Sequence, residues 1–348
     1  MPDTARKVVS VFAYVVRRVL QGLVLLLVMS LVTFLLFFAA GTNPARVSCG
    51  KNCSPALQKQ TAKALGYDQP VIVQWGQFLQ GVVKGRDYPN DPALKKAHPE
   101  LIAHCAAPCL GYSRVNNETV NTLVKDAIPV TASLAWMAFL IWIGGGILFG
   151  VIAALRQGTV VDRGIVGISL LLYAFPTFFT GLFLYEFVAI KWQLVPIPNF
   201  VSIGDGGVGG YLVGLLLPGF TLALFTMAGY VRMTRAFVIE SMGEDYLRTA
   251  NAKGLAPRRV LIKHSMRAAL TPLVTMAGLD LAVLLGGAII TESVFNYDGL
   301  GKLQISAVQN LDLPLTVGIV LLLASFVVIA NIVVDILYAV IDPRVRVG

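Results

Sequence analysis

Six long runs of apolar residues alternate with polar stretches along this chain. Each run approaches or exceeds the roughly 20 residues that a helix needs to cross the hydrocarbon of a bilayer. The pattern therefore predicts six transmembrane helices, and with them an all-α membrane protein. The approximate bounds of the runs are residues 19–40, 129–155, 164–190, 211–231, 273–291 and 315–338.

The long polar stretch after the first run contains one further helix signal. Apolar residues recur there at helical spacing, which predicts a short amphipathic helix. This helix either lies along the outer membrane surface or packs inside a small outer domain. Its apolar positions are Val71, Trp75, Phe78, Leu79 and Val82.

The distribution of Lys and Arg predicts which loops face the cytoplasm. Sixteen of the 28 lie in the short segments expected inside, whereas the two short outer loops hold only Lys191 and Lys302. By the positive-inside rule, both termini are therefore expected in the cytoplasm. The stretch between the first two spans holds the other ten, but long loops cross the membrane regardless of charge, so we expect it outside.

This organisation divides the chain into three parts. Residues 1–40 form a cytoplasmic N-terminus and the first span, and residues 41–127 form a large extracytoplasmic loop or subdomain. Residues 128–348 form a core of five spans, which includes a cytoplasmic loop at residues 240–272. The first run is too long for a signal-peptide core and lacks a small-residue cleavage signal, so we expect it to be retained.

Composition and charge agree with a membrane protein. Hydrophobic residues make up 56% of the chain and charged residues only 14%, against about half and about a quarter in soluble domains. The net charge of +9 could indicate nucleic-acid binding. However, the cations gather in short loops between apolar runs and do not line a basic groove, so we expect contact with membrane lipid and no nucleic acid.

Four cysteines lie in the outer stretch: Cys49, Cys53, Cys105 and Cys109. An oxidising compartment favours disulfides, and we expect two of them to tie the segment at about residues 87–110 to the start of the loop. Three connectivities are open. A metal or iron–sulfur site is an alternative, although such sites usually have two-residue spacers and these pairs have three. Free thiols are the third interpretation.

The sequence contains none of the common catalytic motifs. No G-x-x-x-x-G-K-[ST] phosphate loop is present, and neither is an H-E-x-x-H or a G-x-S-x-G motif. We therefore expect that this chain is not an enzyme and does not hydrolyse ATP itself. We also expect it to bind no cofactor and no metal.

A few residues within the spans are candidates for a translocation path. Asp280 lies in the fifth span, where an acidic group is costly and often functional. It either lines a path or makes a structural hydrogen bond to another span. Pro176 predicts a kink in the third span. Gly286 and Gly287 predict close helix packing at a gate.

Other positions have a structural interpretation first. The glycines at residues 144–146 and Gly150 predict a close-packing face on the second span. Glu292 and Asp335 lie near span ends. Acidic groups at membrane depth are candidates for function, but at a span end the first interpretation is a carboxylate that is solvated at the interface or held by a structural contact.

Residues 244–272 form a polar, basic island between the fourth and fifth spans. A helix-forming segment starts at Asp245, and Gly254 predicts its end, because glycine adopts the left-handed conformation of a helix C-cap without steric cost. Pro257 stands where a second helix would start. The island therefore predicts a short helix, a tight turn and another helix.

The residues of this island resemble the cytoplasmic coupling loop of ABC-importer permeases. The similarity is carried by the run from Asp245 to Ala250, by Ala252-Lys253-Gly254-Leu255 and by Pro272. More narrowly, the chain is similar to the B-type permease subunit of dipeptide, oligopeptide and nickel importers. One departure is Asn251, where relatives usually carry Arg.

The resemblance extends over nearly the whole chain. It includes Ala153-Ala154-Leu155-Arg156, the FPTF sequence at Pro176, Glu292-Ser293-Val294-Phe295 and the ending from Asp335 to Arg344. The segment at about residues 87–110 lacks a counterpart in the family.

The resemblance implies an ABC type I importer permease fold in the bacterial plasma (inner) membrane, as a multi-pass subunit. It implies a second permease subunit, two ATPase subunits or domains that hold ATP and Mg, an extracytoplasmic substrate-binding protein and a peptide substrate. Nickel, glutathione or a sugar is the alternative cargo, and a membrane sensor or scaffold is the alternative class. The implied ATPase-coupling residues are Asp245, Tyr246, Arg248, Thr249, Ala250, Asn251, Ala252, Lys253, Gly254 and Leu255.

Overall fold

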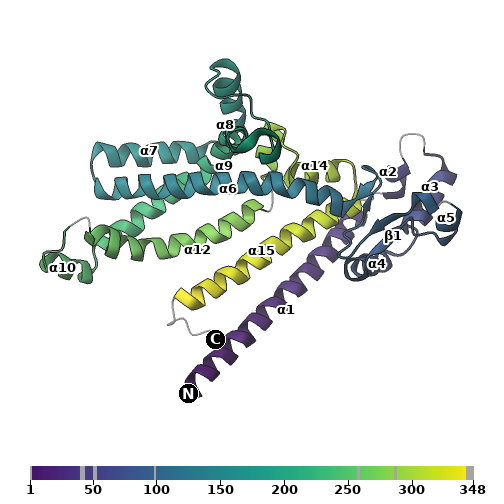
Figure 1. The fold of residues 1–348 in the computed structure, drawn as a ribbon, viewed down its shortest axis with the longest axis horizontal. Helices are drawn as coiled ribbons and strands as arrows, with labels where there is room; N and C mark the ends of the chain where they lie inside the picture. Colours follow the sequence, from purple (N-terminus) through teal and green to yellow (C-terminus); the bar gives the residue numbers. More distant parts are fainter. Residues whose placement is uncertain are drawn as a thin grey trace. The chain divides into compact units, whose positions relative to one another are not determined.

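The computed structural model describes residues 2–39, 44–49, 53–97, 99–256, 259–285 and 288–341. The described chain is mostly helical (Figure 1). It divides into two compact units, which are described separately. The terminal unit comprises Met1–Pro129 and Asp298–Gly348, and the central unit comprises Val130–Tyr297.

The terminal unit combines long helices with short helices and two small antiparallel sheets, β1 with β2 and β3 with β4. Its helices are α1 (Pro2–Ala39), α2 (Pro44–Cys49), α3 (Pro55–Leu65), α4 (Val71–Lys84), α5 (Pro92–Ala97), η1 (Pro99–Leu101), α14 (Leu300–Gln309) and α15 (Leu313–Ile341). Its strands are β1 (Arg86–Tyr88), β2 (Ala103–Cys105), β3 (Tyr112–Ser113) and β4 (Glu118–Thr119).

In the central unit, every regular element among the described residues is a helix. Helix α6 (Val120–Leu155) contributes residues to both units. The other helices are α7 (Val160–Ala174), α8 (Thr177–Leu184), η2 (Tyr185–Lys191), α9 (Ile203–Met242), α10 (Asp245–Ala252), η3 (Val260–Ser265), α12 (Met266–Leu285) and α13 (Ile289–Phe295).

The prediction of a helical membrane protein is confirmed. Four helices in the described part are long and apolar enough to cross a membrane, and two bent helix pairs raise this number to six if each pair is one span. The four single stretches are Val16–Phe38, Val120–Leu155, Ile203–Met242 and Leu313–Val333. The bent pairs are Val160–Ala174 with Thr177–Lys191, and Val260–Leu270 with Pro272–Leu285.

The kink predicted at Pro176 is confirmed, and it is a complete break of the helix. Helix α7 ends at Ala174, and the chain resumes in α8 at an angle of 101°. Proline lacks the N–H of the helix ladder, and its ring disfavours helical geometry in the residue before it. Pro176 then starts the new helix, since its carbonyl accepts a hydrogen bond from the Thr180 N–H at 3.1 Å.

Helices α1 and α15 lie side by side in the terminal unit (Figure 1), and α4 packs against both. Phe34, Phe78, Leu313 and Val317 form the buried cluster at this contact. The Trp75 indole N–H donates to the Ser30 hydroxyl at 2.9 Å. The predicted amphipathic helix therefore exists, and its apolar face packs within the protein, which supports the second of the two interpretations.

Asp312 caps the start of α15 and ties it to β3. Its carboxylate accepts hydrogen bonds from the Leu315 N–H at 3.3 Å and from the Ser113 hydroxyl. Burial raises the pKa of Asp312, while these two hydrogen bonds act in the opposite direction. The cap satisfies one of the free N–H groups at a helix start.

The four cysteines form two disulfides, as predicted, but the pairs do not link the regions that were expected to be joined. Cys49 pairs with Cys53 and Cys105 pairs with Cys109, with Cα–Cα distances of 5.4 Å in both. The expectation that disulfides tie the segment at about residues 87–110 to the start of the loop is therefore wrong. Residues four apart can bring their Cα atoms within the usual bridging range, so each pair closes locally. Among the described residues, no cluster of metal-ligating side chains occurs.

The predicted close-packing face of α6 is confirmed for three of its four glycines. A Cβ atom added at these positions would lie 2.4–2.6 Å from side-chain atoms of α9, closer than atoms can approach. At two of the three positions the clash is with a Cβ atom close to the α9 backbone, so glycine is required there for this close packing. At Gly145 the clash is only with the flexible end of a methionine side chain, which can move aside. The pairs are Gly145 with Met227, Gly146 with Tyr230 and Gly150 with Thr234, whereas a Cβ at Gly144 would meet nothing within 4 Å.

The core of the central unit lies where α6, α9 and α12 meet. Trp142 and Leu273 are fully buried there, and Tyr230 is nearly so. Hydrogen bonds add to this packing: the Thr131 hydroxyl donates to the fully buried Glu292 at 2.7 Å, and the Tyr297 hydroxyl donates to the Gly214 carbonyl at 2.7 Å. Glu292 thus has a structural contact, one of its two interpretations.

We expect Gly150→Ala to lower the stability of the protein by about 1–3 kcal/mol, because a methyl group there overlaps Thr234 and lies 2.8 Å from the Val231 carbonyl oxygen. The matched control is Gly144→Ala, which has open space and should be neutral or stabilising by up to about 1 kcal/mol. Thermal unfolding of the detergent-purified protein measures both. Equal melting temperatures for the two variants would contradict the glycine-dependent contact.

Candidate functional site

The predicted coupling helix is present as α10, and one of its faces is buried. Leu247 and Ala250 pack against Val260, with Leu255 at the edge of the cluster. Their spacing of three residues places both on one side of the helix. This small cluster holds α10 against the start of the following helical segment.

The opposite face of α10 is exposed and carries polar and aromatic side chains. Tyr246 is 45% exposed, although it is a large aromatic residue. Arg248 and Asp245 approach to 3.6 Å, but both side chains are mostly in solvent, so this ion pair contributes little to stability. Their hydrogen-bonding groups are therefore available to a partner. The other exposed positions of the predicted coupling set are Thr249, Ala252, Lys253 and Gly254.

Gly254 ends the turn after α10 as predicted. Its φ is +74°, which is the left-handed region that favours glycine. A Cβ atom at this position would meet nothing within 4 Å. The demand for glycine therefore comes from backbone conformation and not from crowding. The side chain of Asn251 and the whole of Pro257 lie outside the described part of the structure.

Two buried serines connect the end of α9 to the segment after α10. The hydroxyl oxygens of Ser241 and Ser265 are 2.6 Å apart, and both residues are buried. Below them, Ala154, Val238 and Ala269 form a compact apolar cluster. The pattern of apolar and polar positions does not predict this pair, because serine occurs both in buried and in exposed positions.

A hollow of about 370 Å³ lies beside the coupling helix. It is lined by the end of α9 and the start of α12, with Tyr246 from α10 at its edge. Glu240 and Glu244 provide two exposed carboxylates on this surface. The surface next to α10 is therefore acidic and partly aromatic.

Asp280 makes the interhelical contact that was one of its two interpretations. The Tyr230 hydroxyl donates to its carboxylate at 2.5 Å, which joins α9 to α12. Tyr230 is almost fully buried, while Asp280 is only partly so. The carboxylate thus has a structural partner and retains some exposure. Gly286 and Gly287 lie outside the described residues, so the structure does not place them near Asp280.

An ion pair that the sequence analysis missed joins α7 to α9. Arg235 donates two hydrogen bonds to the Asp162 carboxylate, at 2.6 and 2.8 Å, and the Gly158 N–H adds a third at 2.9 Å. Asp162 is buried, and such a bidentate geometry is among the stronger polar contacts in proteins. Arg235 had been counted only among the cytoplasmic cations, since pairing across 73 positions leaves no local pattern.

Comparison with known protein families identifies the class of protein. The family described as "Binding-protein-dependent transport system inner membrane component" matches residues 146–347. The N-terminal region of such membrane components matches residues 11–135. The chain belongs to this family, and it is therefore a multi-pass component of an inner membrane.

Individual relatives match almost the full length of the chain. A putative peptide transport system permease protein of Brucella abortus is 34% identical over 334 residues, which is 96% of this chain and 99% of that protein. A probable peptide ABC transporter permease protein of Sinorhizobium fredii is 31% identical over 96% of this chain and 99% of its own length. The dipeptide transport system permease protein DppB of Escherichia coli is 32% identical over 91% of this chain and 94% of its own length.

One solved structure shares the fold. A chain of the methionine ABC transporter MetNI, crystallised in inward-facing conformations, superimposes with a TM-score of 0.51 at 15% sequence identity. The match covers 64% of this chain and 97% of that chain. Membership of the family makes this chain a membrane component of a transport system and not an enzyme, and it implies an ATPase and a binding protein as partners.

Proposed function

We propose that this chain is the permease subunit of an ATP-driven importer of dipeptides and oligopeptides. The observation that carries the proposal is the match, over 91–96% of the chain, to permeases named for peptide or dipeptide transport. In this function the chain forms half of a translocation path, and a second permease subunit forms the other half. ATP and Mg are bound by the partner ATPase subunits.

In the proposed mechanism, α10 transmits the movement of the ATPase to the spans. Its exposed face, with Tyr246 and Arg248, docks on the ATPase, and the acidic hollow at Glu240 and Glu244 receives basic groups of the same partner. Ala250 and Leu255 act from the buried face by holding α10 in place. The Ser241–Ser265 contact supports the transmission, because it fixes the end of α9 to the chain that follows α10.

The proposed topology has six spans with both termini in the cytoplasm. The two bent helix pairs each count as one span, and the break at Pro176 provides irregular backbone at membrane depth, which proteins tolerate where it lines a cavity. Asp280 lies on the path and faces the amino group of the peptide. Its partial exposure and its single donor, Tyr230, among the described contacts support this role.

The experiment that tests the proposal is co-purification followed by an activity assay. The chain is expressed with its genomic neighbours, isolated through a tag on this chain, and assayed for ATP hydrolysis with dialanine and the neighbouring binding protein. We expect stoichiometric ATPase and hydrolysis that peptide-loaded binding protein stimulates. A chain that purifies alone would contradict the importer function. Stimulation by nickel, glutathione or a sugar, but not by peptides, would contradict the substrate class.

We expect Gly254→Val to uncouple ATP hydrolysis from peptide uptake. A β-branched residue at a φ of +74° is strained by about 1–3 kcal/mol, which distorts the turn that holds α10. The control is Gly254→Asn, because asparagine tolerates this conformation and the site has room for it. Basal hydrolysis and its stimulation by loaded binding protein are measured in reconstituted vesicles. Full stimulation in the valine variant would refute the prediction.

Replacing Asp280 with Asn tests the path. The amide oxygen still accepts the hydrogen bond from Tyr230, so thermal stability should be retained, but the loss of charge should lower dialanine uptake several-fold. The comparison variant, Tyr230→Phe, keeps the charge and removes the hydrogen bond, which should cost about 1–3 kcal/mol of stability. If Asp280→Asn transports at the wild-type rate, Asp280 has a structural role only.

A further inference from the structure

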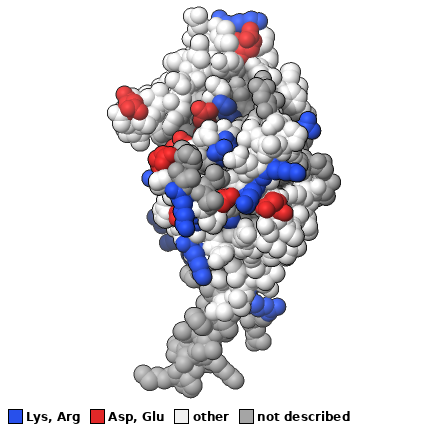
Figure 2. All heavy atoms as spheres, turned by 90° about the vertical axis from the view of Figure 1, so that its right-hand side faces the viewer, with Lys and Arg blue, Asp and Glu red and all other residues white. Residues whose placement is uncertain are grey.

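The face of the protein turned to the viewer in Figure 2 carries both signs of charge. Lys and Arg side chains lie close to Asp and Glu side chains there and do not form a patch of one sign. Such a surface is poorly suited to a polyanion, because neighbouring carboxylates repel it. It is better suited to a ligand that carries charges of both signs.

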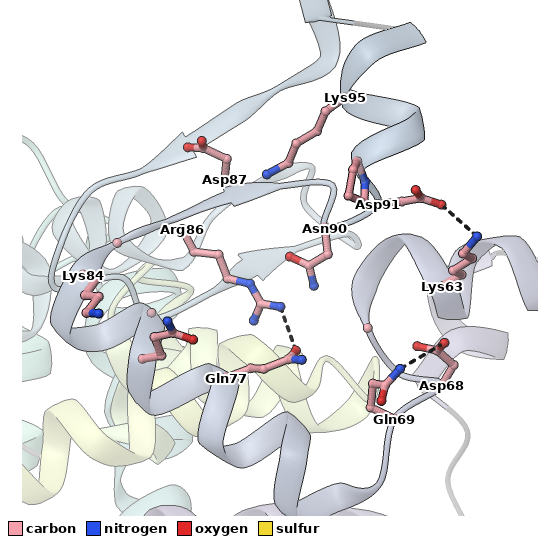
Figure 3. Close-up of a pocket in the computed structure, with 15 residues that line it drawn as sticks. Lys63, Asp68, Gln69, Gln77, Lys84, Arg86, Asp87, Asn90, Asp91 and Lys95 are labelled. Atoms are coloured by element: carbon pink, nitrogen blue, oxygen red, sulfur yellow. Dashed lines mark hydrogen bonds and ion pairs between the residues drawn. The ribbon is translucent and has the colours of Figure 1, made fainter.

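Within the terminal unit, α3, α4, β1 and α5 enclose a polar hollow (Figure 3). Its volume is about 510 Å³, within the range of small-ligand sites. Almost all of its lining side chains are charged or carry amides. The function assigned above uses no residue of this hollow.

Arg86 is the central cation of the hollow. It extends from β1 into the space between the elements, where Gln77 accepts one of its hydrogen bonds at 2.9 Å (Figure 3). A guanidinium has five N–H donors, so this contact leaves donors for a ligand. Lys95 reaches in from α5, and Lys84 stands at the end of α4. Neither lysine has an ion-pair partner among the described residues, so the positive charge here is not neutralised from within.

The carboxylates of the hollow are arranged differently. Asp91 approaches Lys63 at 3.6 Å, and Asp87 contacts His104 at 2.5 Å, so both are engaged by side chains at the rim. Asp68 lies on the wall formed by the turn after α3, and its one hydrogen bond among the described residues is a long one, accepted from Gln69 at 3.5 Å. The hollow thus offers a cationic group around Arg86 and Lys95 and a separate carboxylate at Asp68.

The wall that carries Arg86 is held rigidly by the second disulfide. Arg86 is the register partner of Cys105 in the small sheet, and the Cys109 N–H donates to the Gly81 carbonyl at 3.3 Å. Gly85 has a φ of +77°, and a Cβ there would lie 2.9 Å from the Cys105 carbonyl oxygen. The Cys105–Cys109 loop therefore fixes the turn between α4 and β1, and a ligand site gains affinity when its groups are pre-ordered in this way.

We propose that this hollow is a binding site for small zwitterionic peptides, with Arg86 and Lys95 holding the carboxylate and Asp68 facing the amino group. The inference rests on the proposed function for the choice of peptide. The arrangement of charges supports a ligand with both a negative and a positive group. A fork-shaped guanidinium matches a carboxylate, and the acidic residues on the same walls disfavour phosphate and other polyanions. The site would hold a peptide on the same chain that forms the path.

The test uses the complete transporter complex in lipid nanodiscs, without binding protein, and dialanine as the probe. Saturation-transfer NMR detects the bound peptide and gives its affinity. We expect the double variant Arg86→Gln/Lys95→Gln to bind at least about tenfold more weakly, the loss expected for one hydrogen bond to a charged group. Dialanine amide, which lacks the carboxylate, should bind the wild type as weakly as dialanine binds the variant.

The control is Lys59→Gln, which removes one positive charge from an exposed position on α3 outside the hollow. It should bind dialanine like the wild type. Equal affinity of wild type and double variant, or equal binding of dialanine and its amide, would overturn the proposal. A third outcome would also overturn the proposal: the double variant binds dialanine normally but binds the substrate-binding protein more weakly. Arg86 and Lys95 would then contact an acidic side chain of that protein and not a peptide.

Uptake assays on the same preparations separate the two hypotheses. If the wild type imports dialanine with binding protein and ATP, but the double variant binds dialanine normally, only the peptide site fails. If the wild type imports no peptide, the proposed function fails, whatever the NMR result. The variant Cys105→Ser/Cys109→Ser tests whether the disulfide orders the turn that carries Arg86. It should weaken dialanine binding while the complex remains assembled.

Discussion

The close approach of α6 and α9 is the contact on which the central unit depends. In a bilayer, burying apolar side chains between helices gives little advantage, so association relies on close packing and on hydrogen bonds between spans. The glycines of α6 provide the first, with Gly146 and Gly150 directly against α9. The Tyr230–Asp280 and Arg235–Asp162 contacts provide the second, and they tie α9 to α12 and α7. Helix α9 is therefore held on several sides by contacts that tolerate little displacement.

The contacts that hold α9 also bear on the coupling role proposed for α10. Helix α10 begins at Asp245, close after α9 ends at Met242, and the short turn between them leaves little freedom of movement. In the proposed mechanism, a force on the exposed face of α10 would pass through Leu247 and Ala250, which pack against Val260, into the segment that follows. The same force reaches the end of α9 through the Ser241–Ser265 contact.

The sequence was informative wherever a local pattern reflects a local cause. Apolar periodicity predicted the helix at Val71–Lys84, glycine spacing predicted the packing face of α6, and Gly254 predicted the turn after α10. Contacts between distant positions left no such pattern. The Asp162–Arg235 pair and the hollow around Arg86 form only when elements that are separate in the sequence pack together. Neither residue type nor local spacing predicts them. The pairing of the four cysteines stayed open for the same reason, since spacing permits several connectivities, and the expected link to the start of the loop was wrong.

The local disulfides have a consequence for how the molecule tolerates reduction. A cross-link between residues four positions apart closes a very small loop, so it removes little freedom from the unfolded chain, on the order of 2 kcal/mol in the chain-entropy model. A long-range pairing would have bound distant parts of the terminal unit together. With Cys105 and Cys109 bridging only each other, a reducing environment alters the shape of one loop. Because this disulfide links none of the membrane-spanning helices, reducing it breaks no covalent connection between them.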